Sequence, residues 1–115
     1  MTNRLKLVTW NINSVRLRMP IVEQLIEEVA PDVICLQETK CPDANFPEKA
    51  FRAAGYEHMA INGQKGYHGV ATLSKLPLSN VEKRDFCNVG DSRHVAVDVP
   101  FNGAAIRVHN FYVPA

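Results

Sequence analysis

Residues 33–40, which read Val-Ile-Cys-Leu-Gln-Glu-Thr-Lys, constrain the fold of this chain more than any other segment. Four apolar residues in a row, with β-branched types among them, predict a strand that is buried on both faces. The polar residues that follow indicate where this strand leaves the core, which puts Glu38 at its carboxyl end. Ligands bind at that end in open α/β architectures, because the loops there converge on a crevice.

The residues alone leave two interpretations of the Glu38 carboxylate. It can bind a hard cation such as Mg²⁺, which prefers oxygen ligands and needs only one or two carboxylates when a phosphate supplies the rest. Alternatively, Glu38 is a strand-end acid that accepts a hydrogen bond from neighbouring backbone or pairs with Lys40.

The predicted elements follow the order of an α/β fold whose last third is rich in strands. A strand over residues 5–11 ends at Asn and Ser residues that favour turns. A helix then begins near Pro20, carries apolar side chains at helical spacing up to Val29, and ends at the next proline. After the central strand over residues 32–37, a short helix is predicted from about residue 46 to residue 54. Later strands are predicted over residues 56–62, 70–74, 81–85, 94–99 and 105–113.

The composition excludes several classes of protein. Of the 115 residues, 46% are hydrophobic and 22% are charged, which is typical of an ordinary globular protein and not of a disordered one. The net charge of +1 excludes a bulk attraction to nucleic acid, so binding to a polyanion requires a local cluster of cations. No run of residues is apolar enough to span a membrane, and three cysteines without framework spacing favour free thiols. We therefore expect a cytoplasmic protein with no membrane partner.

The later strands have no predicted helix to cover them, because residues 112–115 follow directly after the last strand. We therefore expect an apolar sheet face without a cover, and such a face usually marks an interface. A second copy of the chain, packed sheet on sheet as a homodimer, is one candidate for the cover. Further polypeptide is the other.

Several segments together resemble the amino-terminal half of the exonuclease III type of abasic-site endonuclease, which belongs to the endonuclease/exonuclease/phosphatase superfamily. The segments are residues 6–16, 32–40, 63–71, 91–95 and 110–114. The resemblance implies an α/β (α+β) fold: the amino-terminal half of a four-layer αββα sandwich, with a mixed β-sheet and helices on one face. It also implies that residues 1–115 form a single partial domain, truncated at the carboxyl end.

The same resemblance implies a metal and phosphate site. Glu38 matches the family's metal-binding glutamate, and Asn11 matches the asparagine that supports the metal and the phosphate. Asn13 falls where relatives carry an asparagine or aspartate near the metal, and Tyr112 matches the active-site tyrosine that contacts the scissile phosphate. The implied catalytic residues are Tyr112 and Asn11, and the implied cofactor is Mg²⁺, with Mn²⁺ as a substitute. Without the resemblance, Tyr112 would be interpreted as a strand aromatic that packs the sheet.

The implied partner is double-stranded DNA with abasic sites or 3′ ends. Tyr67 and Arg93 match positions that contact the DNA backbone, while Lys40 and Arg16 are basic loop residues that can line the same groove. A magnesium ion on Glu38 would act as a Lewis acid, compensating charge on the phosphate and stabilising the leaving oxygen.

The residues on which the family depends later in its sequence have no counterpart here, so we expect the 115-residue chain to be inactive alone. None of its histidines is expected to replace them, because lone strand histidines are more often structural. Two other interpretations stay open. One is a superfamily phosphatase acting on phospholipids or inositol phosphates, and the other is a non-enzymatic, truncated module that binds DNA or dimerises.

Overall fold

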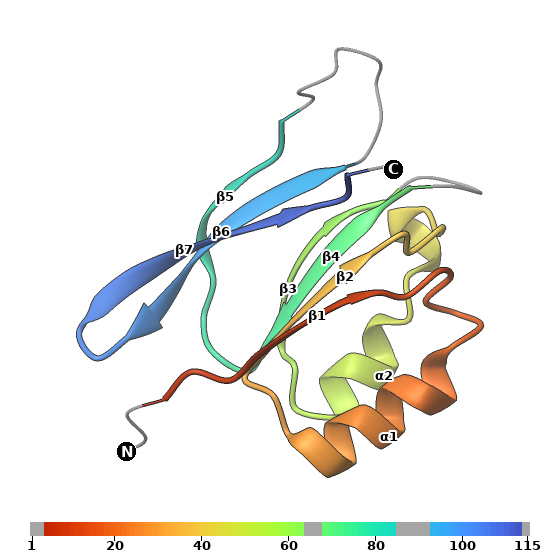
Figure 1. The fold of residues 1–115 in the computed structure, drawn as a ribbon, viewed down its shortest axis with the longest axis horizontal. Helices are drawn as coiled ribbons and strands as arrows, with labels where there is room; N and C mark the ends of the chain where they lie inside the picture. Colours follow the sequence, from red (N-terminus) through yellow and green to blue (C-terminus); the bar gives the residue numbers. More distant parts are fainter. Residues whose placement is uncertain (1–3, 64–67, 85–92, 114–115) are drawn as a thin grey trace.

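Two β-sheets stack face to face to form the body of the protein (Figure 1). The computed structural model describes residues 4–63, 68–84 and 93–113. Within these ranges the first sheet is mixed, with the order β1-β2-β4-β3, and the second is antiparallel, with the order β5-β6-β7. The strands are β1 Leu7–Asn11, β2 Val33–Gln37, β3 His58–Asn62, β4 Val70–Ser74, β5 Ser79–Glu82, β6 His94–Phe101 and β7 Ala104–Phe111.

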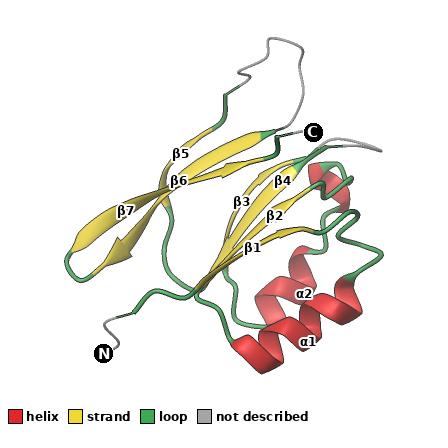
Figure 2. Ribbon diagram, in the orientation of Figure 1, coloured by secondary structure: helices red, strands yellow, loops and turns green. Residues whose placement is uncertain are grey.

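Two helices, α1 Met19–Val29 and α2 Glu48–Ala53, cover the outer face of the first sheet (Figure 2). A proline lies in the first turn of α1, as the sequence predicted, because its fixed φ angle suits that position. Below the helices, the buried side chains of Val22, Phe51, Ile34 and Leu36 form one core cluster. No helix among the described residues is long and apolar enough to cross a membrane.

Strand β2 lies in the interior of the protein, and all five of its residues are buried. Its alternate side chains enter two different cores: Ile34 and Leu36 face the helices, while Val33 and Cys35 pack against the second sheet. The continuous apolar run therefore has the doubly buried environment that it predicted. The mixed α/β architecture with helices on one face is confirmed, and the second sheet covers the other face.

The uncovered apolar surface is smaller than the sequence suggested, because β6 and β7 of the same chain pack on the first sheet. Large apolar side chains are exposed at several places, including Leu17, Ile21, Val81 and Val113. Three others lie along the edge strands β1 and β7, and we call them the apolar strip. Leu7 on β1 is 40% exposed, and Ile106 and Phe111 on β7 are 38% and 43% exposed. A groove of ≈310 Å³ lies between these two edges.

The elements differ from the predicted ones mainly at their ends. The edge strand expected over residues 81–85 is Ser79–Glu82, shifted toward the amino terminus, and position 85 lies outside the described residues. Its side chains are mostly exposed, and its pairing with β6 is irregular, so no apolar alternation marked it in the sequence. A short 3₁₀ helix, Asp43–Asn45, precedes α2 and was not predicted.

Candidate functional site

Strand polarity gathers the predicted site residues at one end of the molecule. β1 and β2 run parallel, so Asn11 is paired with Gln37 and both carboxyl ends lie side by side. Strand β4 runs the opposite way and brings His68 and Gly69, just before it, to the same end. In the second sheet, the start of β6 and the end of β7 meet there as well (Figure 1).

The loop that carries Glu38 is held by backbone hydrogen bonds on both sides. These bonds continue the pairing of β2 beyond its last residue, toward β1 on one side and toward β4 on the other. They are Ser14 N–H to Glu38 O (2.9 Å), Val15 N–H to Thr39 O (3.1 Å), Thr39 N–H to Gly69 O (3.1 Å) and Lys40 N–H to His68 O (2.9 Å). The loop is therefore as well fixed as a strand, which suits a residue that must hold one geometry.

Three of the predicted site residues have left-handed backbone conformations. The φ angles are +53° at Asn13, +55° at Glu38 and +53° at Lys40. Asparagine adopts such angles readily, but for residues such as Glu38 and Lys40 they are uncommon and cost on the order of 1 kcal/mol or more. They persist only where the surrounding structure enforces them, and they cluster at functional sites.

Tyr112 meets Glu38 across the gap between the two sheets. The backbone N–H of Tyr112 donates to the carbonyl of Arg93 at 2.8 Å, which extends the β6–β7 pairing by one step. The phenol hydroxyl donates to the Glu38 carboxylate, and this hydrogen bond raises the pKa of Tyr112, as does burial, while the charge of Arg93 acts against the rise. The ring of His68 packs at a tilt against the Tyr112 ring, with 5.4 Å between centroids.

Lys40 binds a different partner from the one that the residues suggested. Its Nζ donates to the side-chain oxygen of Asn13 at 2.5 Å, so the ammonium joins the loop after β1 to the loop after β2. Among the described ion pairs there is none between Lys40 and Glu38. The interpretation of Glu38 as the salt-bridge partner of Lys40 is therefore wrong, because that cation is engaged elsewhere.

The other predicted residues lie at the rim of this site or beyond it. Asn11 is exposed at the end of β1. Arg16 is exposed too, and its charge acts on the thiol of Cys41, whose pKa is raised mainly by burial. Tyr67 lies outside the described residues. The structure thus brings Glu38, Tyr112 and Arg93 together, whereas Arg16 lies close enough to Cys41 for its charge to act on that thiol.

The donor chemistry of the site fits a hard cation in part. The Glu38 carboxylate and the amide oxygens of Asn11 and Asn13 are the ligand type that Mg²⁺ prefers. The Asn13 oxygen already accepts the Lys40 ammonium. Within residues 4–63, 68–84 and 93–113, no three His, Cys, Asp or Glu side chains form a group that could hold a metal. A cation here would therefore need oxygens from phosphate and water as well.

The sequence did not predict two residues that lie next to the site. Gln37 and Asn110 are both buried, and Gln37 Nε2 donates to Asn110 Oδ1 at 2.8 Å between the sheets. The available signal was a polar residue inside an otherwise apolar strand, directly next to Glu38 in one case and two residues before Tyr112 in the other. The contact between His68 and Tyr112 had no signal in the sequence.

Residues 8–114 match the model of the endonuclease/exonuclease/phosphatase family, which is nearly the whole chain. The chain belongs to this family. The resemblance deduced from the motifs is thereby confirmed, and the mixed sheet with helices on one face is the corresponding part of the family fold.

Relatives within the family include exodeoxyribonuclease III of Haemophilus influenzae, which is 36% identical over 113 residues, covering 96% of this chain and 42% of that protein. The structure is similar to that of an AP endonuclease from Archaeoglobus fulgidus, with a TM-score of 0.84, 38% identity and coverage of 96% and 42%. It is also similar to the 3′ phosphatase NExo from Neisseria bound to a product DNA hairpin, with a TM-score of 0.84, 34% identity and coverage of 95% and 41%. The chain thus spans about two fifths of the length of these relatives.

Proposed function

We propose that the chain is the amino-terminal portion of a DNA repair nuclease of the exonuclease III type. The reaction would be Mg²⁺-dependent hydrolysis of phosphodiester bonds at abasic sites and 3′ ends. The observation that carries this proposal is the packing of Tyr112 against His68, at the end of the sandwich where the Glu38 loop is hydrogen-bonded to the residues just before β4. The named activities of the similar proteins, an exodeoxyribonuclease, an AP endonuclease and a 3′ phosphatase bound to DNA, support it.

Each residue has a role that its chemistry supports. Glu38 would hold the cation together with Asn11 and Asn13, and the bound Mg²⁺ or Mn²⁺ would supply Lewis-acid charge compensation. Tyr112 would donate a hydrogen bond to a phosphate oxygen. Its pKa is raised from an ordinary value that already lies well above neutral pH, so the phenol is protonated and acts as a donor without adding negative charge.

The proposed DNA contacts come from cations around the same site. Arg93 is close enough to Tyr112 to affect its ionisation, and Lys40 lies one loop away, bound to Asn13. Arg16 and Tyr67 are proposed to contact the phosphate backbone further along the duplex. Contacts of this kind position a nucleic acid without reading its sequence, which suits recognition of a lesion.

Two further parts of the proposal concern the state of the protein. We propose that a second copy of the chain covers the apolar strip along β1 and β7, because exposed apolar edges of this kind favour association. We also propose a cytoplasmic location, which the buried thiols of Cys35 and Cys41 support.

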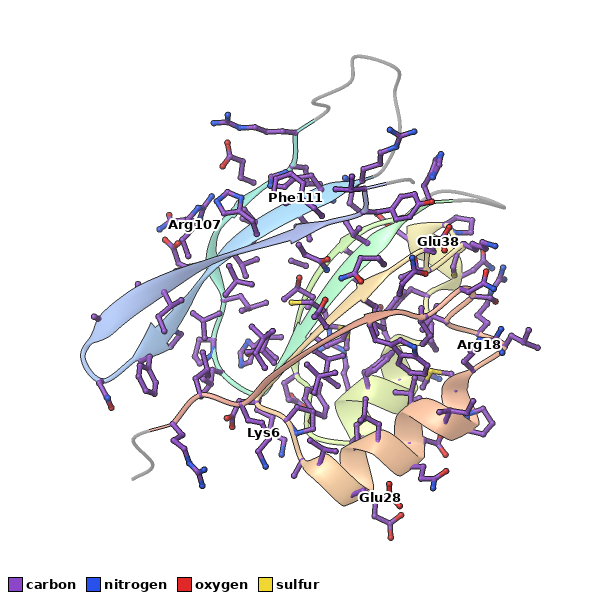
Figure 3. All side chains as sticks on the ribbon, in the orientation of Figure 1. Lys6, Arg18, Glu28, Glu38, Arg107 and Phe111 are labelled. Carbon is purple, nitrogen blue, oxygen red and sulfur yellow. The ribbon has the colours of Figure 1, made fainter. Side chains whose placement is uncertain are left out.

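The function is tested with a short duplex that contains one abasic-site analogue. In Mg²⁺, the chain should bind this duplex more tightly than phosphoinositide vesicles, and Glu38→Gln should weaken the binding about 10-fold, because a lost carboxylate costs the metal its charged ligand. In EDTA the variant and the parent chain should bind alike. Glu28→Gln, on α1 at the opposite end of the molecule, is the matched control (Figure 3).

Incision of the same duplex tests the expected inactivity of the chain by itself. We expect no cut product from the 115-residue chain, since the family's later residues have no counterpart in it. Cutting that Glu38→Gln abolishes would show that the chain is a complete enzyme. If the chain bound the abasic duplex and phosphoinositide vesicles equally, and Glu38→Gln changed neither affinity, the nuclease proposal would be contradicted. The result would favour a superfamily phosphatase or a non-enzymatic module.

A further inference from the structure

The carboxamide of Asn110 bridges the two sheets. Asn110 lies on β7, and only 2% of its surface is exposed. Its Nδ2 donates to backbone carbonyls of β2 and β4 and to one hydroxyl, all in the first sheet. The acceptors are Leu36 O (3.2 Å), Ala71 O (3.0 Å) and Thr72 Oγ1 (3.3 Å). Because these acceptors hold the amide nitrogen, the Oδ1 atom must point toward Gln37.

Gln37 connects this bridge to β1. Its Nε2 donates to Asn110 Oδ1 at 2.8 Å and to Thr9 Oγ1 at 3.0 Å. The two buried amides therefore join three strands of the first sheet to one strand of the second. Gln37 immediately precedes Glu38, and Asn110 lies two residues before Tyr112 on the same face of the chain.

One other side-chain hydrogen bond joins the two sheets, from Asn62 Nδ2 at the β3 edge to His94 O on β6 at 2.9 Å, whereas the inter-sheet core next to β7 is mainly apolar. It consists mainly of small aliphatic side chains, including Val33, Val70, Val95 and Val97. Apolar contacts between them are non-directional, so a slide of one sheet on the other by about 1 Å would cost them little. The same slide would break hydrogen bonds, which weaken steeply with distance and angle. A fully satisfied polar network in an apolar core thus specifies one arrangement.

We propose that Asn110 is a positioning residue for the site: its bridge to the first sheet sets the register in which the Tyr112 ring packs against His68, beside the Glu38 loop. The inference deepens the proposed function and rests on it only for the roles of Tyr112 and Glu38. Asn110 itself does not touch the phosphate. Its effect on the reaction would pass through Tyr112.

The ¹⁹F chemical shift of Tyr112 reports this register without requiring catalysis, because it depends on the neighbouring His68 ring, whose centroid lies 5.4 Å from that of Tyr112. The full chain is prepared with 3-fluorotyrosine, and the Tyr112 signal is assigned with Tyr112→Phe. His68→Ala gives the chemical shift of Tyr112 without the neighbouring ring. In Asn110→Leu, which keeps the side-chain size, the Tyr112 signal should move from its position in the parent chain toward that of His68→Ala.

Val108→Ala separates positioning from simple destabilisation. Val108 lies on the same face of β7, two residues away, and packs in the inter-sheet core without polar bonds from its side chain. This variant should lower the melting temperature and leave the ¹⁹F chemical shift of Tyr112 unchanged. A chemical shift that moves equally in Val108→Ala would overturn the proposal, because any loosening of the sheets would then suffice.

A second variant covers the case in which Asn110→Leu does not fold. Gln37→Met keeps the length of the side chain and removes its bonds to Asn110, Thr9 and the Cys35 carbonyl, so it should move the Tyr112 signal by a smaller amount. An unchanged chemical shift in a folded Asn110→Leu or Gln37→Met protein would also refute the positioning role. A moved signal supports the role even where the DNA-binding test fails, so the two failures are distinguishable.

Discussion

At the scale of single residues, the site depends on side chains and backbone angles that are unusual for their residue types. Glu38 has a φ angle of +55°, which turns its carboxylate out of the alternation of β2 and toward Tyr112. Another unusual residue is His94, which is fully buried at the start of β6. Its Nδ1 accepts the backbone N–H of Arg84 at 3.1 Å, and its Nε2 lies 3.1 Å from His109 Nδ1.

This environment of His94 predicts a loss of stability in mild acid. An Nδ1 atom that accepts a hydrogen bond must be unprotonated, so the fold binds the neutral imidazole. The pKa of His94 is lowered by burial and then by His109, with Arg84 and Arg107 adding to the effect and Glu82 opposing it. Below the ordinary value of 6.5, the unfolded chain therefore binds more protons than the folded one.

The free energy of unfolding should consequently fall as the pH drops through 6.5, until the lowered pKa of the folded state is reached. Urea unfolding at pH 8, 7, 6 and 5 measures this trend. His94→Gln, which cannot titrate in this range, should show a shallower slope over the same interval. A parent chain that is equally stable at every one of these pH values would show that His94 is not held neutral by the fold.

At the scale of elements, hydrophobic periodicity predicted the helices and most strands. Some elements, however, end at residues that are not typical of helix or strand ends. Helix α1 ends at Ala30, which has φ +49° and ψ +56° and donates its N–H to Ile26 O at 2.9 Å. This left-handed position is the one that glycine usually occupies at the end of a helix. An alanine there carries the strain of a Cβ atom in a crowded conformation.

Ala30→Gly should therefore stabilise the protein by roughly 0.5–1 kcal/mol, the relief of strain exceeding the added freedom of the unfolded chain. Chemical denaturation of both proteins gives the difference. Ala50→Gly, in the interior of α2, is the opposite control and should destabilise by about 1 kcal/mol, because glycine is a poor helix former. Destabilisation by both substitutions would argue against the assigned conformation of Ala30.

At the scale of the whole molecule, the edge strands β1 and β7 lie on the same side, with a groove between them that both apolar and polar side chains line. Leu7 and Ile106 are exposed there, and the unpaired backbone of an edge strand is a template for another strand. The proposed homodimer would pair or cover these edges. Its formation can be measured without any assumption about catalysis.

Light scattering at micromolar concentration should give about twice the chain mass of 12.9 kDa. Ile106→Lys, which places a charge in the apolar strip, should return the protein to a monomer, whereas Lys49→Glu on the exposed surface of α2 should not. A monodisperse monomer of the parent chain would exclude the homodimer and leave further polypeptide as the cover.

The sequence by itself predicted most helices and strands and the candidate residues of the site, because local patterns of residue types mark both. The apolar run before Glu38 predicted a doubly buried strand with a polar carboxyl end, and the structure has that strand with all five residues buried. The motifs around Asn11, Glu38 and Tyr112 indicated the family, which the match over residues 8–114 confirms.

Only the tertiary structure decided which of these residues meet. Gln37 and Asn110 are 73 positions apart in the chain, and their hydrogen bond exists because one sheet packs on the other. The same packing places Tyr112 next to Glu38 and His68. The loop conformations let the Lys40 ammonium donate a hydrogen bond to Asn13 and not to Glu38. Local patterns carry no information on such contacts, since they depend on the register between sheets, which forms when distant side chains pack together.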